Sequence, residues 1–186
     1  MEKRFTNQPD VVEWEWSDII LKDKNGKEIF NRKCQFPKTW SYNARVITAS
    51  KYFTNDENSF DQVVQRIVST ITQAGIKQKV LSTENSEDII FATELAHIMC
   101  NQIAAFNSPC FFNVGVEGRP KQASACFLLD VEDNMESILD WMKTEALIFK
   151  GGSGSGVNVS KLRASGEPIH PRGSSSGPLS FMAAAD

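Results

Sequence analysis

The feature that most constrains this chain is a glycine-rich loop between a segment with helical periodicity and an apolar, strand-like segment. The loop is Gly151-Gly152-Ser153-Gly154-Ser155-Gly156, so four of its six residues are glycines. Glycine has no Cβ, and its bare backbone can approach a ligand closely. Composition alone favours a flexible linker. The short length and the apolar flanks make the segment a candidate ligand-binding loop instead.

The length and net charge of the chain limit how many domains it can form and which partners it can bind. With 186 residues, 41% of them hydrophobic, the chain is long enough for one domain, or one and a part, with a sizeable core. The net charge of -3 argues against a general affinity for nucleic acid. No apolar run reaches the roughly 18–20 residues of a membrane span, and the start lacks a signal peptide. We therefore expect a cytoplasmic protein without a DNA or membrane partner.

The cysteines and histidines do not form a metal-binding pattern. The chain has two histidines and four cysteines, at positions His97, His170, Cys34, Cys100, Cys110 and Cys126. None has CxxC or zinc spacing, so we expect no metal site. In a reducing compartment a disulfide would be catalytic rather than structural. Cys126 differs by its place within a predicted strand between two candidate phosphate sites, with a buried structural cysteine as the alternative.

Residues 1–106 are predicted to form a helical domain with an irregular leader. A turn at 23–26 separates two short strands in this leader. Apolar residues at spacings of three and four predict helices over 39–53, 60–71 and 87–106. We expect Gly75 to end the second helix and Ser86 to cap the third.

Residues 107–186 are predicted to alternate strands with helices, which is typical of an α/β fold or an α+β fragment. The helical period stops at 107–109, and strands are predicted over 111–116, 124–129 and 157–162. The second strand is apolar on both faces, as in a layered sheet. A helix over 135–149 follows Asp133, which forms a capping-box pattern with Glu136. A polar loop then leads into a helix that begins near Leu179.

Several polar residues favour a nucleotide or phosphate ligand. Ser108 lies next to free backbone N–H groups at a helix–strand junction, although most Ser-Pro pairs are plain turns. Arg163 and Arg172 offer bidentate pairing with phosphate. Asp133 either caps its helix or accepts from a ribose hydroxyl. The glycine loop lacks the Gly-Lys-Ser/Thr ending of a P-loop.

Five ordered motifs give the chain a family resemblance over about residues 37–186. They are Asn107-Ser108-Pro109, Ser124-Ala125-Cys126-Phe127, Val131-Glu132-Asp133-Asn134-Met135, Gly154-Ser155-Gly156-Val157-Asn158 and Ser176-Gly177-Pro178-Leu179. Together they closely resemble the adenosylcobalamin-dependent (class II) ribonucleotide reductases. The resemblance implies a helical domain over 1–106, followed over 107–186 by the beginning of a ten-stranded α/β barrel, which this chain truncates.

The resemblance also implies roles for particular residues. Cys126 matches one of the two thiols that reduce the ribose through thiyl-radical chemistry. Ser108 matches a residue that binds substrate phosphate, and Ser153 and Gly154 match the loop that lines the substrate. The remaining two matches lie in the effector site: Asp133 reaches the effector's ribose and Arg163 its phosphates.

The implied ligands and partners belong to a larger enzyme. They are adenosylcobalamin, a ribonucleotide substrate, a deoxynucleotide (nucleoside triphosphate) effector, a thioredoxin- or glutaredoxin-type reductant, the rest of the reductase chain and a second copy in a homodimer. The sequence lacks the family's Asn-x-Cys-x-Glu motif with the radical cysteine, so we expect this chain to be inactive alone. A class I large-subunit fragment and a non-catalytic nucleotide-binding or interaction module remain alternatives.

Overall fold

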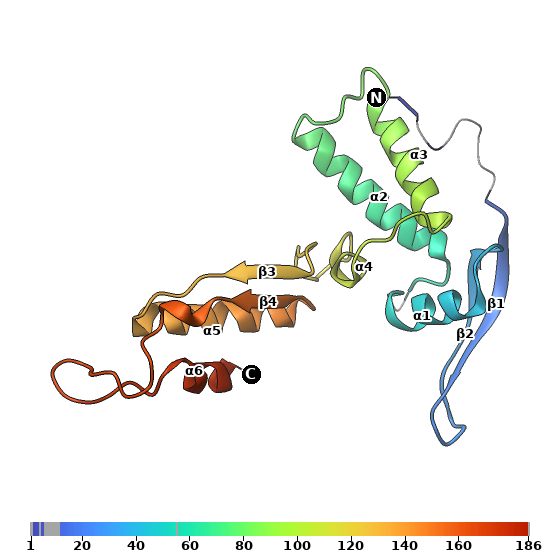
Figure 1. Ribbon diagram of the computed structural model, residues 1–186. Coiled ribbons are helices and arrows are strands. Elements are labelled where there is room, and N and C mark those ends of the chain that lie inside the picture. The colour runs from blue at the N-terminus through green and yellow to red at the C-terminus, as the bar shows by residue number, and fades with distance from the viewer. Residues whose placement is uncertain (1, 4, 6–11, 55, 186) are drawn as a thin grey trace. The chain divides into compact units, whose positions relative to one another are not determined.

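The computed structural model describes residues 2–3, 5, 12–54 and 56–185. The chain divides into two compact units, Met1–Lys121 and Gln122–Asp186, each of which is described by itself. Their elements are labelled in Figure 1. Helices and small sheets are mixed, which confirms the predicted α+β character. Within the described part, no helix is long and apolar enough to cross a membrane.

The first unit begins with an antiparallel hairpin of β1 (Trp14–Lys22) and β2 (Glu28–Pro37). The turn between them is held by Asp23, whose Oδ1 accepts from the backbone N–H groups of Asn25 at 2.8 Å and Lys27 at 3.0 Å. Gly26 takes the positive φ of 82° that the turn requires. The predicted turn between two strands is confirmed.

Three helices form the main body of the first unit: α1 (Tyr42–Lys51), α2 (Phe60–Lys77) and α3 (Glu87–Cys100). Ser41 caps α1 by accepting from the Ala44 N–H at 3.3 Å. The prediction that Gly75 ends α2 is wrong, because the helix continues through it. A Cβ at Gly75 would lie 2.7 Å from Leu81 Cδ1, so this glycine allows a close approach of Leu81.

The third helix also differs from its prediction. It ends at Cys100 rather than Phe106, because Gln102 adopts a positive φ of 55° that leaves the helical path. Ser86 precedes the helix, but its own φ of 57° is left-handed and its side chain makes no capping hydrogen bond. The expected serine cap is therefore absent at this position.

A short helix, α4 (Ser108–Asn113), replaces the strand predicted over 111–116. Pro109 explains the difference, because proline fits the first turn of a helix, where its missing N–H is not needed. Phe111 is buried by this helix in the core of the first unit. Alternating apolar residues in so short a segment do not distinguish a strand from a helix.

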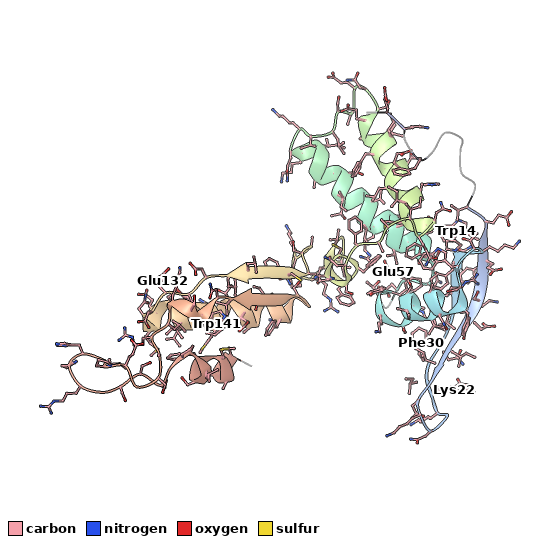
Figure 2. The ribbon with its side chains drawn as sticks, viewed as in Figure 1. Trp14, Lys22, Phe30, Glu57, Glu132 and Trp141 are labelled. Carbon is pink, nitrogen blue, oxygen red and sulfur yellow. The ribbon has the colours of Figure 1, made fainter. Side chains whose placement is uncertain are left out.

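The core of the first unit is built around Phe36 on β2, whose side chain is 0% exposed. Its ring stacks on Trp40 at 5.7 Å and on Phe53 at 5.4 Å between centroids. The Trp40 indole then donates from Nε1 to the Cys100 carbonyl at 2.7 Å, which fastens the end of α3 to this cluster. The aromatic cluster thus joins the hairpin, on which Figure 2 labels Trp14, Lys22 and Phe30, to the helices.

The second unit contains β3 (Cys126–Leu129), α5 (Met135–Lys150), β4 (Gly154–Val157), the 3₁₀ helix η1 (Val159–Lys161) and α6 (Pro178–Ala185). Strands β3 and β4 are parallel and joined through α5. The predicted helices near 135–149 and 179–185 are confirmed. The strand predicted over 124–129 was expected to be buried on both faces. This burial is not found within the described residues, where the Leu128 side chain of β3 is 94% exposed.

The prediction of a strand over 157–162 is wrong, because the strand that pairs with β3 is the second half of the glycine loop itself. After Val157 the chain turns at Asn158, whose side chain accepts from the Ser160 N–H at 3.0 Å. This local hydrogen bond favours a turn over continued strand pairing. The start of a barrel at residue 107 stays a prediction, and the compact units divide after Lys121.

The aromatic cluster gives a direct test of the first unit. We expect Phe36→Ala to lower the free energy of unfolding by about 3–5 kcal/mol, because it removes a fully buried ring from a packed site. Urea denaturation followed by circular dichroism measures the change. The control is Ile29→Ala on the same strand, where the side chain is 63% exposed and we expect a change within about 0.5 kcal/mol. Equal effects of the two substitutions would contradict the placement of the core.

Candidate functional site

The parallel pairing of β3 with β4 places the glycine loop beside Cys126. In the register of the two strands Cys126 lies opposite Gly154, and Leu129 lies opposite Val157. The backbone N–H of Gly154 donates to the Ala125 carbonyl at 2.7 Å, immediately before the cysteine. Two of the predicted site residues, Cys126 and Gly154, are therefore neighbours on adjacent strands.

One side of the loop is fixed by the buried residue Ser153. Its Oγ donates to the Ser124 carbonyl at 2.5 Å and accepts from Gln122 Nε2 at 2.5 Å. The same Gln122 amide donates to the Ile148 carbonyl at 3.1 Å. A Cβ on Gly151 would lie 2.5 Å from the Gln122 side chain, so the glycine makes room for this amide. We call Gln122, Ser153 and Gly151 the loop clamp.

The other side of the loop is held by helix α5. Ser155 Oγ donates to Glu145 Oε1 at 2.5 Å, and Glu145 is buried under the loop with 9% of its surface exposed. Sequence reasoning missed both Gln122 and Glu145. Glu145 lies in an amphipathic helix where a charged residue is expected to face solvent, and Gln122 lies in a segment without periodicity. Neither gave a signal in the sequence.

Cys126 differs from the other thiols in its exposure. It is exposed, whereas Cys34, Cys100 and Cys110 are buried. Burial raises the pKa of Cys34 and Cys110 above the usual thiol value, and it raises the pKa of Cys100 to about 11. The alternative of a buried structural cysteine at position 126 is therefore wrong within this unit. The exposed Cys126 is the thiol that an incoming molecule can reach.

Asp133 and Arg163 lie together and form an ion pair. Arg163 Nε donates to Asp133 Oδ2 at 2.7 Å, and the Arg163 backbone N–H lies 3.4 Å from Asp133 Oδ1. Their side chains are 34% and 35% exposed. The predicted cap at Asp133 is wrong, because Asn134 caps α5 by accepting from the Ser137 N–H at 2.9 Å. Asp133 is free of a capping role and points instead to the arginine.

A second set of charges lies next to this pair. Lys161 Nζ contacts Asp130 Oδ2 at 2.7 Å and Glu132 Oε1 at 2.6 Å. The hydrogen bond from Lys161 lowers the pKa of Asp130, and the Asp130 carboxylate in turn raises the pKa of Lys161. The acids of residues 130–133 thus face basic residues that follow β4, and the charges on this face largely offset one another.

Ser108 belongs to the first unit, whereas the other five predicted site residues belong to the second. It begins helix α4, and its Oγ lies 3.1 Å from the Tyr52 hydroxyl. The Tyr52 ring stacks on Phe111 of the same helix, with 4.9 Å between centroids. The Ser108 hydroxyl is thus held by a hydrogen bond to a tyrosine of its own unit, and the ring of that tyrosine packs against the same helix.

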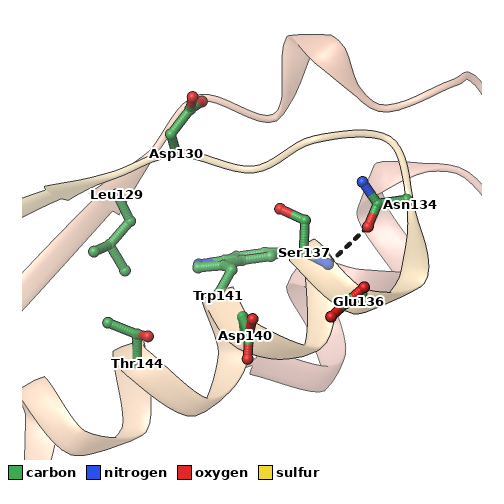
Figure 3. A pocket seen from close by; sticks show the side chains of 8 residues that line it. All are labelled: Leu129, Asp130, Asn134, Glu136, Ser137, Asp140, Trp141 and Thr144. Atoms are coloured by element: carbon green, nitrogen blue, oxygen red, sulfur yellow. Dashed lines mark hydrogen bonds between the residues drawn. The ribbon is translucent and has the colours of Figure 1, made fainter.

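Each unit has a cavity lined by described residues. The first unit has an apolar cavity of about 250 Å³, lined by Trp40, Ala44, Ile47, Thr48, Tyr52, Phe60, Met99, Gln102, Ala104, Ala105, Phe106 and Phe111. The second unit has a polar cavity of about 360 Å³ beside α5 (Figure 3). Within the described parts of the chain, no group of three or more His, Cys, Asp or Glu residues is placed to hold a metal ion.

Comparison with known families gives two matches. Residues 54–102 match the profile described as class II vitamin B12-dependent ribonucleotide reductase, and residues 124–186 match the profile of the ribonucleotide reductase barrel domain. The second match contains the paired strands, the glycine loop, Cys126 and the Asp133–Arg163 pair. Both matches agree with the resemblance that the motifs predicted.

Individual relatives agree with these profiles. The vitamin B12-dependent ribonucleotide reductase of Streptomyces coelicolor is 45% identical over 95% of this chain and 19% of its own length. The corresponding protein of Rhodopirellula baltica is 34% identical over 93% of this chain and 20% of its own length. A ribonucleoside-diphosphate reductase large subunit of Ostreid herpesvirus 1 is 41% identical over 52% of this chain. The chain thus spans about a fifth of the first two relatives.

The difference in thiol exposure leads to a prediction about alkylation. The thiolate is the reactive form of cysteine, and a pKa of about 11 leaves Cys100 with about one part in a thousand as thiolate at pH 8. We therefore expect iodoacetamide at pH 8 to label one thiol per chain rapidly, and mass spectrometry to place it on Cys126. The three buried cysteines should react only after denaturant is added.

The matched variant is Cys126→Ser, which should remove the fast phase and leave the three slow thiols unchanged. Rapid labelling of a second cysteine in the folded chain would contradict the assigned burial.

Proposed function

The chain belongs to the class II vitamin B12-dependent ribonucleotide reductases, and from this premise we propose that it forms the N-terminal part of an enzyme that converts ribonucleotides to deoxyribonucleotides. The observation that carries the proposal is the position of the exposed Cys126 directly beside Gly154 of the clamped loop. A thiol reductant next to bare, fixed backbone suits a ribose that must be held close to sulfur.

We propose that Cys126 is one of two thiols that reduce the ribose. In the overall reaction the 2′-hydroxyl leaves as water and is replaced by hydrogen, and the two thiols supply two electrons and two protons as they become a disulfide. The radical cysteine and the second thiol are assigned to the rest of the reductase. A thioredoxin- or glutaredoxin-type protein would then return the disulfide to thiols.

The clamped loop would contribute its backbone to the substrate site. The hydroxyl of Ser153 is already occupied by Gln122 and the Ser124 carbonyl, so its role is to fix the loop rather than to reach the substrate. Gly154 is exposed, and a Cβ added to it would meet nothing closer than the Ala125 carbonyl at 3.9 Å, which leaves space for a ligand. The resemblance assigns binding of the substrate phosphate to Ser108, at the start of α4.

The Asp133–Arg163 pair would form part of a deoxynucleotide effector site. In this proposal Asp133 accepts from the ribose hydroxyl and Arg163 binds the phosphates. Both groups now pair with each other at 2.7 Å, so the effector must exchange this contact for its own. Ion pairs at a partly exposed site contribute only about 0–1 kcal/mol, so the exchange costs little.

Adenosylcobalamin would supply the radical chemistry of the complete enzyme when it is bound. Neither of the two cavities described above, of about 360 and 250 Å³, has room for a corrin ring with its nucleotide tail. We therefore assign none of its contacts to these residues and derive no step through it.

The proposed homodimer is supported by an apolar stripe on α5. Met135, Leu139 and Phe149 lie on this helix at spacings of four and ten residues and are 59%, 56% and 48% exposed. A stripe of this kind on one side of a helix suits packing against another helix. A cytoplasmic location agrees with the family but stays a prediction.

A class I large-subunit fragment is the second candidate, because the herpesvirus large subunit matches about half of the chain. It would use the same thiol chemistry with a separate radical-generating protein and no cobalamin. Cobalamin dependence of the complete enzyme separates the two. The class II profile over residues 54–102 favours the cobalamin-dependent enzyme.

The role of Cys126 is tested in the complete enzyme, with this chain joined to the remaining part of the reductase. We expect Cys126→Ser to abolish multiple turnover with a dithiol reductant, because a hydroxyl cannot form the disulfide. Formation of deoxynucleotide over time measures the effect. Binding of a deoxynucleoside triphosphate should be retained, because Asp133 and Arg163 are unchanged.

The control is Cys34→Ala, which removes a buried thiol on β2 and should retain turnover. Undiminished turnover by Cys126→Ser would overturn the assignment of this cysteine. Retained triphosphate binding without any reductase activity in the assembled protein would favour the non-catalytic nucleotide-binding module instead.

A further inference from the structure

The polar cavity of the second unit is separate from the proposed substrate and effector sites. It has a volume of about 360 Å³ and lies beside the N-terminal half of α5 (Figure 3). Its lining residues come from this helix and from the end of β3 onward: Leu129, Asp130, Asn134, Glu136, Ser137, Asp140, Trp141 and Thr144. None of them is Cys126, a residue of the glycine loop or a member of the Asp133–Arg163 pair.

Trp141 is the buried residue of this lining. It is 4% exposed, yet its indole Nε1 has no hydrogen-bond partner among the described residues. Figure 3 shows the nitrogen end of the ring directed toward the space between Leu129 and Thr144. An unsatisfied buried donor is destabilising, so an occupant that brings an acceptor to this N–H is favoured.

The charge around the indole is negative. Three carboxylates line the cavity, and Asp130 already pairs with Lys161 at 2.7 Å. Glu136 and Asp140 have no ion-pair partner within the described ranges of the chain. The cavity therefore combines a donor that lacks an acceptor with two carboxylates that lack a cation.

An occupant of this cavity should therefore offer both a hydrogen-bond acceptor for the indole and a positive charge for the carboxylates. A metal ion or a polyamine would satisfy the carboxylates but would bring no acceptor to the indole. A nucleotide would bring acceptors, but its phosphates would be repelled by Glu136 and Asp140. A basic residue within a peptide carries both groups, because its backbone carbonyl is a neutral acceptor and its side chain ends in a cation.

We propose that this cavity binds a basic peptide segment, with a backbone carbonyl accepting from Trp141 Nε1 and an arginine or lysine side chain facing Asp140 and Glu136. Leu129 and Thr144 flank the nitrogen end of the indole ring, where the carbonyl would enter (Figure 3). The proposal does not depend on the reductase assignment, because it uses residues outside the proposed substrate and effector sites.

The test follows the indole N–H signals of the chain by ¹H–¹⁵N NMR during titration with Nα-acetyl-arginine N-methylamide. The chain has four tryptophans, and Trp141→Phe identifies the signal of Trp141 by its loss. We expect the arginine probe to move the Trp141 signal progressively and to leave that of Trp16, which is 51% exposed on β1, in place. Nα-acetyl-leucine N-methylamide, which has the carbonyls but no cation, should bind more weakly.

Asp140→Asn is the decisive variant, because Asp140 is exposed and we expect its replacement to preserve the fold even if Trp141→Phe does not. We expect it to weaken binding of the arginine probe by about threefold and to reduce the salt dependence of that binding. Glu117→Gln, at an exposed acid of the first unit, should change neither. Equal binding of the two probes, equal shifts of Trp16 and Trp141, or unchanged affinity in Asp140→Asn would overturn the proposal.

Discussion

The second unit depends on the contacts that fix the glycine loop against strand β3. Ordering the backbone of a residue costs about 1–2 kcal/mol, and glycine loses more freedom than any other residue. A loop with four glycines therefore stays ordered only where other groups hold it. In this unit Gln122 reaches across Gly151 to Ser153 on one side, and Glu145 binds Ser155 on the other. These contacts make the loop a strand rather than a linker.

The ordered loop explains the arrangement of the candidate site. Because Gly154 pairs with the start of β3, Cys126 lies beside backbone that has no side chain to block a ligand. Because β4 ends at Val157, the chain that follows returns Lys161 and Arg163 to the acids of residues 130–133. The thiol and the Asp133–Arg163 pair are therefore positioned by the same short parallel pairing. Disruption of the loop would disturb both.

The sequence predicted structure correctly where apolar residues recur regularly over a whole helix, or where a turn has residues typical of its type. Helix α5 and the hairpin turn at Asp23 follow from regular apolar spacing and from turn chemistry. The predictions failed where an element was too short to show a periodic pattern, or where a residue's position depends on contacts with residues distant in the sequence. Helix α4 has six residues, and β4 consists largely of glycine and serine, which show no alternation. The roles of the six site residues came from resemblance to a family, whereas Gln122 and Glu145 depend on packing that no local pattern reveals.

The central claim is that the glycine loop is a fixed strand beside Cys126. Amide hydrogen exchange at Gly154, measured by NMR on the folded chain, tests it most directly, because this N–H donates to the Ala125 carbonyl at 2.7 Å. We expect exchange as slow as that of amides within α5, and faster exchange when Gln122 is replaced by alanine. Exchange of Gly154 at the rate of an unstructured glycine–serine segment would contradict the claim.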